Sequence, residues 1–400
     1  MKPLAADLFG DVDLRRCCPT VRVEHYPQGL LDALRKIDHS WQLGRTPWMV
    51  TGALENRPDL VEQMAAEWPL YGNRAEVLRS VRDPAMLADA LSAGGFLYPQ
   101  TVLEGDQWVG QHPNTGETGA GETWLCKPRL GSGGGGIVVC DNIVCDNPTN
   151  ENGAAQQALR PSHYLQHRIE GTPSSAVYVA ALSECRLLGI TQQMIGTAWA
   201  GAGGFQYAGS VGPLDVGETL WHSFDVLGRH LAQRFRLVGL FGVDAILSGD
   251  RLWVIEVNPR YTASIEILER ALGIRAVAEH VSACRDGRLL SEVPVSVPVA
   301  SAGPTAPCHD NSCYDNACHG KVILYAERET VVPEAFSRYA QQCNADSSWP
   351  SVADIPAART RIPAGWPITT LFASAANERE VLATLRAQTE VTRGRFFASR

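Results

Sequence analysis

The stretch LWVIEVNPR, residues 252–260, places polar side chains at alternate positions directly after an apolar run. Side chains two residues apart in an extended strand point to the same face. Glu256, Asn258 and Arg260 are therefore expected to share one face. Because an unpaired buried charge is costly, that face is not expected to be dry core.

Asp244 lies in the apolar run LFGVDAIL, and a Ser-Gly-Asp turn separates this run from the next one. The resulting antiparallel hairpin over residues 240–258 brings Asp244 next to Glu256 and Asn258. Carboxylate and amide oxygens are typical ligands of Mg²⁺, which also binds substrate phosphates. Arg260 adds a planar fork for a phosphate oxygen. The spacing alone is equally compatible with a salt-bridged sheet edge.

The stretch WLCKPRLGSGGGG, residues 124–136, predicts a short strand that enters a glycine loop. Glycines let backbone N–H groups approach phosphate oxygens closely, and a nearby lysine supplies a point charge. We therefore expect a phosphate cradle formed by Lys127, Gly131, Ser132, Gly133, Gly134 and Gly135. The run is neither a Walker A loop nor a dinucleotide fingerprint, since no Gly-Lys-Ser/Thr follows. A flexible hairpin tip is the alternative.

The stretch YLQHRIEGTP, residues 164–173, predicts a strand that passes into a turn. Such a strand end presents backbone groups and apolar side chains to the edge of a planar base such as adenine. Gln166 and Glu170 are the polar candidates for the base amino group and the ribose hydroxyls. An ordinary amphipathic strand end is the alternative.

The elements that position these residues begin with a region of alternating strand-like and helix-like runs at residues 1–95. This alternation is typical of a parallel sheet and predicts an N-terminal α/β domain. The expected strands cover 21–26 and 47–53, and the expected helices cover 29–37, 59–68 and 83–95. Asp83 is the expected N-cap of the last helix, and Gly94–Gly95 is its expected stop.

The rest of the chain is expected to form a second domain over residues 96–290, an irregular connection over 291–320 and a C-terminal β-rich segment over 321–400. The expected strands cover 124–128, 163–169, 175–182, 240–247, 251–258, 321–328 and 366–375, and the expected helices cover 224–237, 264–274 and 378–396. These assignments follow the apolar periodicity of each run.

The connection holds a group of possible metal ligands, namely Cys308, His309, Cys313, Cys318 and His319. Zinc sites usually combine tighter cysteine pairs, so we favour a loop insert over a zinc site. The 11 cysteines of the chain, without an apolar signal segment, are expected to be reduced thiols of a cytoplasmic protein.

Composition and charge exclude several classes of function. Hydrophobic residues make up 45% of the chain and charged residues 20%, which is typical of a soluble globular enzyme. A formal net charge of −8 argues against general binding to nucleic acids or anionic membranes. No apolar stretch of about 18 residues occurs, so we expect no transmembrane helix.

The order of these features resembles the ATP-grasp superfamily over about residues 47–375. More closely, ENRPDL, LRSVRDP, FGVDAIL, VIEVNPRYTAS and GKVILYAE are similar to the ATP-grasp proteins related to biotin carboxylase. Relatives of these proteins include the tyramine–glutamate ligase of methanofuran synthesis. The resemblance implies an α+β fold, with an N-terminal α/β domain, two subdomains that clamp ATP and a small C-terminal β-rich segment.

The resemblance also implies a role for each candidate residue. Lys127 would contact the α- and β-phosphates, and Gly133–Gly135 would cover the β- and γ-phosphates. Gln166 and the backbone near Ile169 would contact adenine. One or two Mg²⁺ ions (with Mn²⁺ as a substitute) would be bound by Asp244, Glu256 and Asn258, and the transferred phosphoryl group by Arg260. Arg82 stands where many relatives carry a lysine, and it binds phosphate as a fork rather than a point charge.

Two further segments concern substrates and the chain start. Residues 197–214 are expected to form a long glycine-rich loop that lines an acceptor pocket through Phe205 and Tyr207, whereas Arg186 is a candidate for a substrate carboxylate with a surface role as the alternative. Relatives begin with a strand and a helix before the segment that starts here at residue 5. A misassigned start and the loss of that unit both stay open.

We therefore predict a Mg-ATP-dependent carboxylate–amine ligase that forms an amide or peptide bond through an acyl phosphate. The expected substrates are a small-molecule carboxylate and an amine, with glutamate as donor in one-carbon cofactor synthesis. A homodimer is expected, as in many relatives. A bicarbonate-activating enzyme like biotin carboxylase and a non-catalytic ATP-binding module are the alternatives. The intact set of Asp244, Glu256, Asn258 and Lys127 argues against the module.

Overall fold

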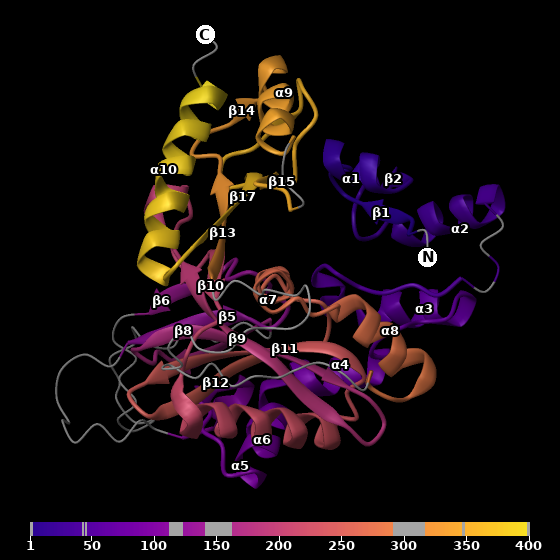
Figure 1. The fold of residues 1–400 in the computed structure, drawn as a ribbon. Coiled ribbons are helices and arrows are strands. Elements are labelled where there is room, and N and C mark those ends of the chain that lie inside the picture. The colour runs from indigo at the N-terminus through magenta and orange to yellow at the C-terminus, as the bar shows by residue number, and fades with distance from the viewer. Residues whose placement is uncertain are drawn as a thin grey trace, which may run out of the picture.

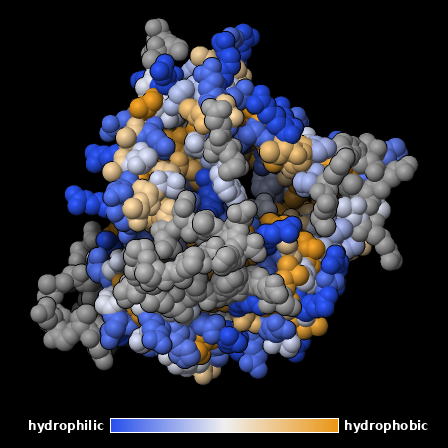
Figure 2. Space-filling model, viewed as in Figure 1, coloured by the Kyte–Doolittle hydropathy of each residue, from blue (hydrophilic) through white to orange (hydrophobic). Residues whose placement is uncertain are grey.

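The computed structural model describes residues 3–41, 44, 46–111, 123–140, 162–290, 317–345 and 349–397. Two sheets dominate this part of the chain, one with eight strands and one with five, and helices pack around them (Figure 1). One face of the molecule is mainly hydrophilic, with apolar residues in small groups (Figure 2). Within the described ranges, no helix has the length and apolar character needed to cross a membrane.

The N-terminal part combines a small parallel sheet with several helices. β1 (Ala5–Asp7) pairs with β2 (Thr20–Arg22) in parallel. The helices are α1 (Val12–Cys17), α2 (Leu30–Trp41), η1 (Ala53–Asn56, a 3₁₀ helix), α3 (Pro58–Glu67), α4 (Ala75–Arg82) and α5 (Pro84–Ala93). The Asp83 side chain accepts hydrogen bonds from the backbone N–H groups of Ala85 and Met86, so the predicted N-cap of α5 is confirmed.

Several features of this part differ from the prediction: the strand expected over 21–26 ends at Arg22, and β1 and α1 were not predicted. Residues 47–53 form no strand: Trp48 makes a single parallel bridge to Leu70, and Ala53 already begins η1. The apolar side chains of this run pack against the N-terminal core, and an apolar run alone does not distinguish a strand from such a segment. Helix α4 was not predicted, although its buried residues have helical spacing.

The smaller sheet is antiparallel and carries the lysine of the predicted phosphate cradle. Its strand order is β4-β3-β7-β5-β6. The bounds are β3 (Thr101–Val102), η2 (Glu104–Asp106, a 3₁₀ helix after it), β4 (Trp108–Val109), β5 (Trp124–Pro128), β6 (Val138–Cys140) and β7 (His163–His167). The register pairs Leu125 with Gln166 and Lys127 with Tyr164. The predicted strands at 124–128 and 163–169 are therefore confirmed, the second with an earlier end.

The larger sheet joins central and C-terminal strands in the order β12-β11-β8-β9-β10-β13-β17-β15. Its bounds are β8 (Thr172–Ala180), β9 (Cys185–Ile195), β10 (Tyr207–Gly212), β11 (Gly239–Ser248), β12 (Arg251–Asn258), β13 (Cys318–Tyr325), β15 (Val352–Ala353) and β17 (Pro367–Ala375). β13 begins at Cys318, inside the range predicted to be irregular.

Strand β10 lies in the segment 197–214 that was predicted to be a loop, so that prediction is wrong for residues 207–212. The short helix η3 (Ala198–Ala200) precedes it. The apolar periodicity of this strand is unclear because it contains glycines, one of which is required by close packing. Gly209 has a φ of +156°, and a Cβ there would lie 2.0 Å from the carbonyl oxygen of Lys321.

Helices cover both faces of the larger sheet (Figure 1). The covering helices are α6 (Gly217–Phe235) with α5 on one face, and α7 (Ile265–Leu272) with α8 (Ala276–Asp286) on the other. Along β8, Ala176 and Tyr178 pack toward α6, whereas Val177 and Val179 pack toward α7 and α8. Helix α6 begins at Gly217, earlier than the predicted residue 224.

The C-terminal elements complete the fold. α10 (Glu378–Phe397) packs on β13 and β17, as predicted for a helix over 378–396. The remaining elements are α9 (Glu334–Cys343), β14 (Thr330–Val331) and β16 (Arg361–Ile362), the last two paired antiparallel. This part of the chain therefore extends the larger sheet through β13, β17 and β15.

Candidate active site

The hairpin of β11 and β12 contains a β-bulge at the predicted metal site. Asp244 pairs with Glu256, but Ala245 pairs with Val254, so Ile255 has no partner. Val254 packs in the core beneath α6, whereas Glu256 lines the cavity described below. An extra residue in one strand re-aims the side chains that follow. The bulge therefore turns Glu256 out of the core and toward Asp244.

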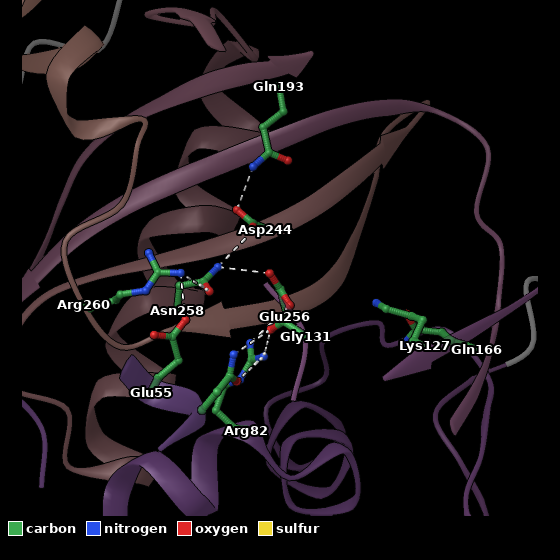
Figure 3. Close-up of polar contacts among 11 residues, drawn as sticks. Glu55, Arg82, Lys127, Gly131, Gln166, Gln193, Asp244, Glu256, Asn258 and Arg260 are labelled. Atoms are coloured by element: carbon green, nitrogen blue, oxygen red, sulfur yellow. Dashed lines mark hydrogen bonds and ion pairs between the residues drawn. The ribbon is translucent and has the colours of Figure 1, made fainter. Parts of the chain in front are cut away.

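The side chains of Asp244, Glu256 and Asn258 lie together (Figure 3). Asn258 Nδ2 donates to Asp244 Oδ2 at 3.0 Å and to Glu256 Oε1 at 3.3 Å. Gln193 Nε2, from β9, donates to Asp244 Oδ1 at 3.0 Å. The structure thus brings the three expected side chains to one place, and their role as metal ligands stays a prediction.

The two carboxylates are partly buried and respond differently to their surroundings. Burial raises the pKa of Asp244, and the neighbouring Glu256 charge raises it further. Burial also acts to raise the pKa of Glu256, but the charges of Arg82 and Lys127 outweigh it and lower that pKa. The negative charge of this pair is therefore incompletely compensated, and added positive charge between the carboxylates would be stabilising.

Arg82, at the end of α4, connects the carboxylates to the glycine loop. Its Nη1 lies 3.2 Å from Glu256 Oε2, and its Nη2 donates to the carbonyl oxygen of Gly131 at 2.8 Å. Asn56 Nδ2 donates to the same carbonyl at 3.2 Å. Only 12% of the Arg82 side chain is exposed. Arg82 is therefore a buried cation that bridges the predicted metal and phosphate sites.

Lys127 and Gln166 lie side by side on β5 and β7. Lys127 Nζ donates to Gln166 Oε1 at 3.0 Å, and Gln166 Nε2 donates to Thr101 Oγ1 at 3.2 Å. Burial lowers the pKa of Lys127, although the Glu256 charge acts in the opposite direction. Each end of the Gln166 amide makes one hydrogen bond within the protein. A second N–H group and a second acceptor position remain, so these bonds do not exclude the predicted contact with adenine.

The glycine run packs against the segment before β10. The backbone N–H of Tyr207 donates to the carbonyl oxygen of Gly133 at 3.0 Å. Gly134 has a φ of +76°, and a Cβ there would lie 1.8 Å from the carbonyl oxygen of Phe205. A close backbone approach therefore requires glycine at this position. The run is a docked segment rather than a free hairpin tip.

A cavity of about 500 Å³ connects these groups. Its volume is in the range of small-molecule and cofactor sites. Its lining includes Arg82, Lys127, Gly131, Ser132, Gly133, Gly134, Gly135, Gln166, Ile169, Glu170, Asp244, Glu256, Asn258 and Arg260. These are all the residues that the sequence analysis assigned to nucleotide, metal or phosphoryl binding. Phe205 and Tyr207 line the cavity as well, as expected of an acceptor pocket.

The sequence analysis missed Glu55, which the structure places against Arg260 (Figure 3). Arg260 Nη2 lies 2.8 Å from Glu55 Oε1, and 3.3 Å from Asn258 Oδ1. Glu55 belongs to ENRPDL, which contributed to the family resemblance. Its type and spacing gave no signal of its own, because acidic residues are common near the start of a helix such as α3. Gln193 gave no signal either, since a polar residue in a strand usually faces solvent.

Other candidates lie away from the cavity or outside the described residues. Arg186 donates to the carbonyl oxygen of Leu290 at 3.1 Å, lies 3.6 Å from the buried Glu279 carboxylate and does not line the cavity, and its role stays a prediction. Cys308, His309 and Cys313 lie outside the described residues. In the part of the chain that is described, no group of three or more His, Cys, Asp or Glu side chains is arranged to hold a metal ion.

Comparison with known proteins identifies the fold. Residues 83–264 match the sequence model of an ATP-grasp domain. Biotin carboxylase from Campylobacter jejuni is similar with a TM-score of 0.62 and 11% identity, over 96% of this chain and 84% of that one. L-amino acid ligase from Bacillus licheniformis reaches a TM-score of 0.61 and 13% identity, over 98% of each chain. N5-carboxyaminoimidazole ribonucleotide synthetase from Thermus thermophilus reaches 0.60 and 14%, over 100% and 93%.

The chain therefore contains an ATP-grasp domain and has the ATP-grasp fold, with biotin carboxylase among its structural neighbours. The predicted α+β fold class and the resemblance to the ATP-grasp superfamily are confirmed. No curated protein matches the sequence. The closer resemblance to tyramine–glutamate ligase and the predicted domain boundaries stay predictions.

Proposed function

We propose that the chain is a Mg-ATP-dependent carboxylate–amine ligase that forms an amide or peptide bond through an acyl phosphate. The observation that carries the proposal is the lining of one cavity, which holds Asp244, Glu256 and Asn258 together with Lys127 and the glycine run. Cation-binding oxygens and phosphate-binding groups thus face the same space. A similar fold in an L-amino acid ligase supports the same class of reaction.

The donor set fits a divalent cation. Two partly buried carboxylates with incompletely compensated charge face an amide side chain, and hard oxygen donors of this kind suit Mg²⁺ or Mn²⁺. Asp244, Glu256 and Asn258 would hold the ion. When bound, it would neutralise the phosphates and help to orient the transferred group.

The remaining cavity residues bind and orient the substrates. Lys127 and Arg82 supply positive charge for the nucleotide phosphates, and the glycine run covers them with backbone N–H groups. Arg260 holds the γ-phosphoryl group in line with the attacking carboxylate oxygen, which displaces ADP and forms the acyl phosphate. The amine then attacks the acyl carbon, phosphate leaves, and the amine proton passes to solvent. Positioning and charge neutralisation supply most of the rate in such transfers.

A screen of carboxylates and amines for stimulated ADP release tests this function. The wild-type protein should release ADP with Mg-ATP, a suitable carboxylate and an amine, and the Glu256→Gln variant should not. The screen should include glutamate with tyramine, because we further propose glutamate as the donor in one-carbon cofactor synthesis. Absence of ADP release with every pair, or equal release from the variant, would reject the ligase function.

Bicarbonate activation is the second candidate. The biotin carboxylase domain of 2-oxoglutarate carboxylase from Hydrogenobacter thermophilus, which has a TM-score of 0.62 and 14% identity, forms a complex with MgADP and bicarbonate. If this chain shares that activity, ADP release depends on bicarbonate and needs no other carboxylate. We also propose that the protein is cytoplasmic and that it forms a homodimer. Light scattering of the purified protein tests the dimer.

A further inference from the structure

We infer, on the basis of the proposed function, that Glu55 is a positioning residue that holds Arg260 in the loaded active site. Glu55 lies in η1 of the N-terminal part, and Arg260 follows β12 of the larger sheet. The contact therefore makes phosphoryl transfer depend on a segment that contributes no predicted ligand of its own.

The Glu55 carboxylate is buried with a single cationic partner. Its side chain is 1% exposed, and Oε1 lies 2.8 Å from Arg260 Nη2. Among the described residues, neither oxygen of this carboxylate has a hydrogen-bond partner of good geometry. A buried charge without compensation is costly, so Arg260 and Glu55 hold each other in place.

The importance of Glu55 increases when a cation is bound. In the structure, Asn258 Nδ2 points toward Asp244 and Glu256, and Asn258 Oδ1 accepts from Arg260 Nη2 at 3.3 Å. An amide that presents its oxygen to a cation between the carboxylates must turn round, so that its Nδ2 faces Arg260. Because an amide N–H group accepts no hydrogen bond, Arg260 then loses this partner. Glu55 remains as the anchor of Nη2.

The backbone before Arg260 is fixed independently, so Glu55 acts on the side chain. Asn73 Nδ2 donates to the carbonyl oxygens of Pro259 at 3.0 Å and of Val238 at 3.1 Å. A cavity of about 10 Å³, comparable to one water molecule, separates these contacts and is lined by Glu55, Asn73, Pro259 and Arg260. The N-terminal part thus holds the backbone through Asn73 and the guanidinium through Glu55.

The test compares Glu55→Gln with the matched control Glu62→Gln. Glu62 forms a 3.0 Å ion pair with Arg79 on the surface, where its side chain is 66% exposed. In Glu55→Gln, kcat for ADP formation should fall by about 10- to 100-fold, since small displacements of a positioning group cost that much. The Kd of MgATP, measured by calorimetry, should change by less than about twofold, and Glu62→Gln should match the wild type. A Glu55→Gln kcat within twofold of the wild type overturns the inference.

A double-mutant cycle separates positioning of Arg260 from a general structural role. If Glu55 acts through Arg260, Glu55→Gln should add less than about twofold to the loss of kcat in Arg260→Gln. Losses that multiply instead, or a MgATP Kd that weakens as much as kcat, overturn the inference. Should Glu55→Gln fail to fold, Glu55→Asp keeps the charge one methylene further back. Its kcat must then lie between those of the wild type and Arg260→Gln.

A structural readout distinguishes failure of this inference from failure of the proposed function. Crystals of Glu55→Gln with MgADP should show the Arg260 side chain displaced, whereas the wild-type complex should show it against Glu55. If the wild type releases no ADP with any substrate pair, the ligase function fails, and the crystal comparison alone decides the role of Glu55. An undisplaced Arg260 in that variant overturns the inference.

Discussion

At the scale of single residues, the cavity concentrates charges that folding alone does not favour. Asp244 and Glu256 lie together in a partly buried position, and Arg82 compensates Glu256 through a 3.2 Å contact. Residues that break the rules of a stable core are expected where binding compensates their cost. β12 is an edge strand of the larger sheet, and Glu256 and Arg260 both form ion pairs there, so the metal-binding role of its polar face stays a prediction beside the salt-bridged edge.

Glu256→Gln removes one of the paired carboxylates while preserving the shape of the side chain. ADP formation should fall by at least about 100-fold, because the loss removes charge that orients and neutralises the reacting phosphates. The rise in Tm that MgATP causes in the wild type should be much smaller in the variant. Glu329→Gln, from an exposed pair with Arg361, serves as the control and should behave as the wild type. An active Glu256→Gln variant would contradict the assignment.

The sequence allowed the ligand set to be predicted because the alternation at 256, 258 and 260 continues beyond the strand. The bulge at Ile255 could not be predicted, because Leu252, Val254 and Glu256 are each two residues apart, as in a regular strand. Glu55 could not be predicted either, because its partner is distant in sequence and the contact depends on how the N-terminal part packs.

At the scale of elements, the cavity depends on contacts between segments that are distant in sequence. The glycine run packs on residues 205–207, and α8 packs on β11 through His280. The strands with clear apolar periodicity, such as 251–258, were predicted correctly. Strand β10 was not, because its glycines serve close packing and obscure the periodicity.

Gly134→Ala tests the docking of the glycine run. A Cβ would overlap the carbonyl oxygen of Phe205, and the φ of +76° adds strain. The run should therefore lose its docked position, and the KM for ATP should rise by roughly tenfold, equivalent to about 1.4 kcal/mol. Gly203→Ala is the control, because no atom lies within 4 Å of its added Cβ. Unchanged kinetics of Gly134→Ala would indicate that this docking does not contribute to ATP binding.

His280 provides a test of the contact between α8, β11 and the N-terminal part. Its Nδ1 accepts from the backbone N–H of Leu240 at 2.9 Å, and its Nε2 donates to the carbonyl oxygen of Tyr71 at 3.1 Å. Burial lowers the pKa of His280, although the Tyr71 carbonyl opposes this shift. The neutral ring therefore stabilises the fold above the ordinary pKa of 6.5, and this contribution is lost as the pH falls further.

The stability advantage of the wild type over His280→Asn, measured in urea, should therefore decrease between about pH 7.5 and pH 5.5, because the difference isolates the His280 contribution from those of other titrating groups. His280→Asn keeps an acceptor for Leu240 but loses the Tyr71 contact, so it should be less stable than the wild type by about 1–3 kcal/mol at pH 7.5 and by less at pH 5.5. His222→Asn, on an exposed position of α6, should follow the wild type. Parallel pH profiles for wild type and His280→Asn would contradict this account.

At the scale of the whole molecule, three parts of the chain meet at one cavity. The N-terminal part contributes Arg82 and contacts Arg260 through Glu55, the smaller sheet contributes Lys127, and the larger sheet contributes Asp244 and Glu256. The C-terminal strands extend the larger sheet, which the sequence did not indicate because strand pairing is a long-range property. Binding of one nucleotide should therefore stabilise all three parts together.

The central claim is that ATP binds this cavity together with a divalent cation held by Asp244, Glu256 and Asn258. Calorimetric titration of the purified protein with ATP, in Mg²⁺ and in EDTA, tests it most directly. We predict saturable binding in Mg²⁺ that weakens by at least about tenfold in EDTA and to a similar extent in Glu256→Gln with Mg²⁺. Binding of equal strength in all three conditions, or no binding of ATP to the wild type, would contradict the claim.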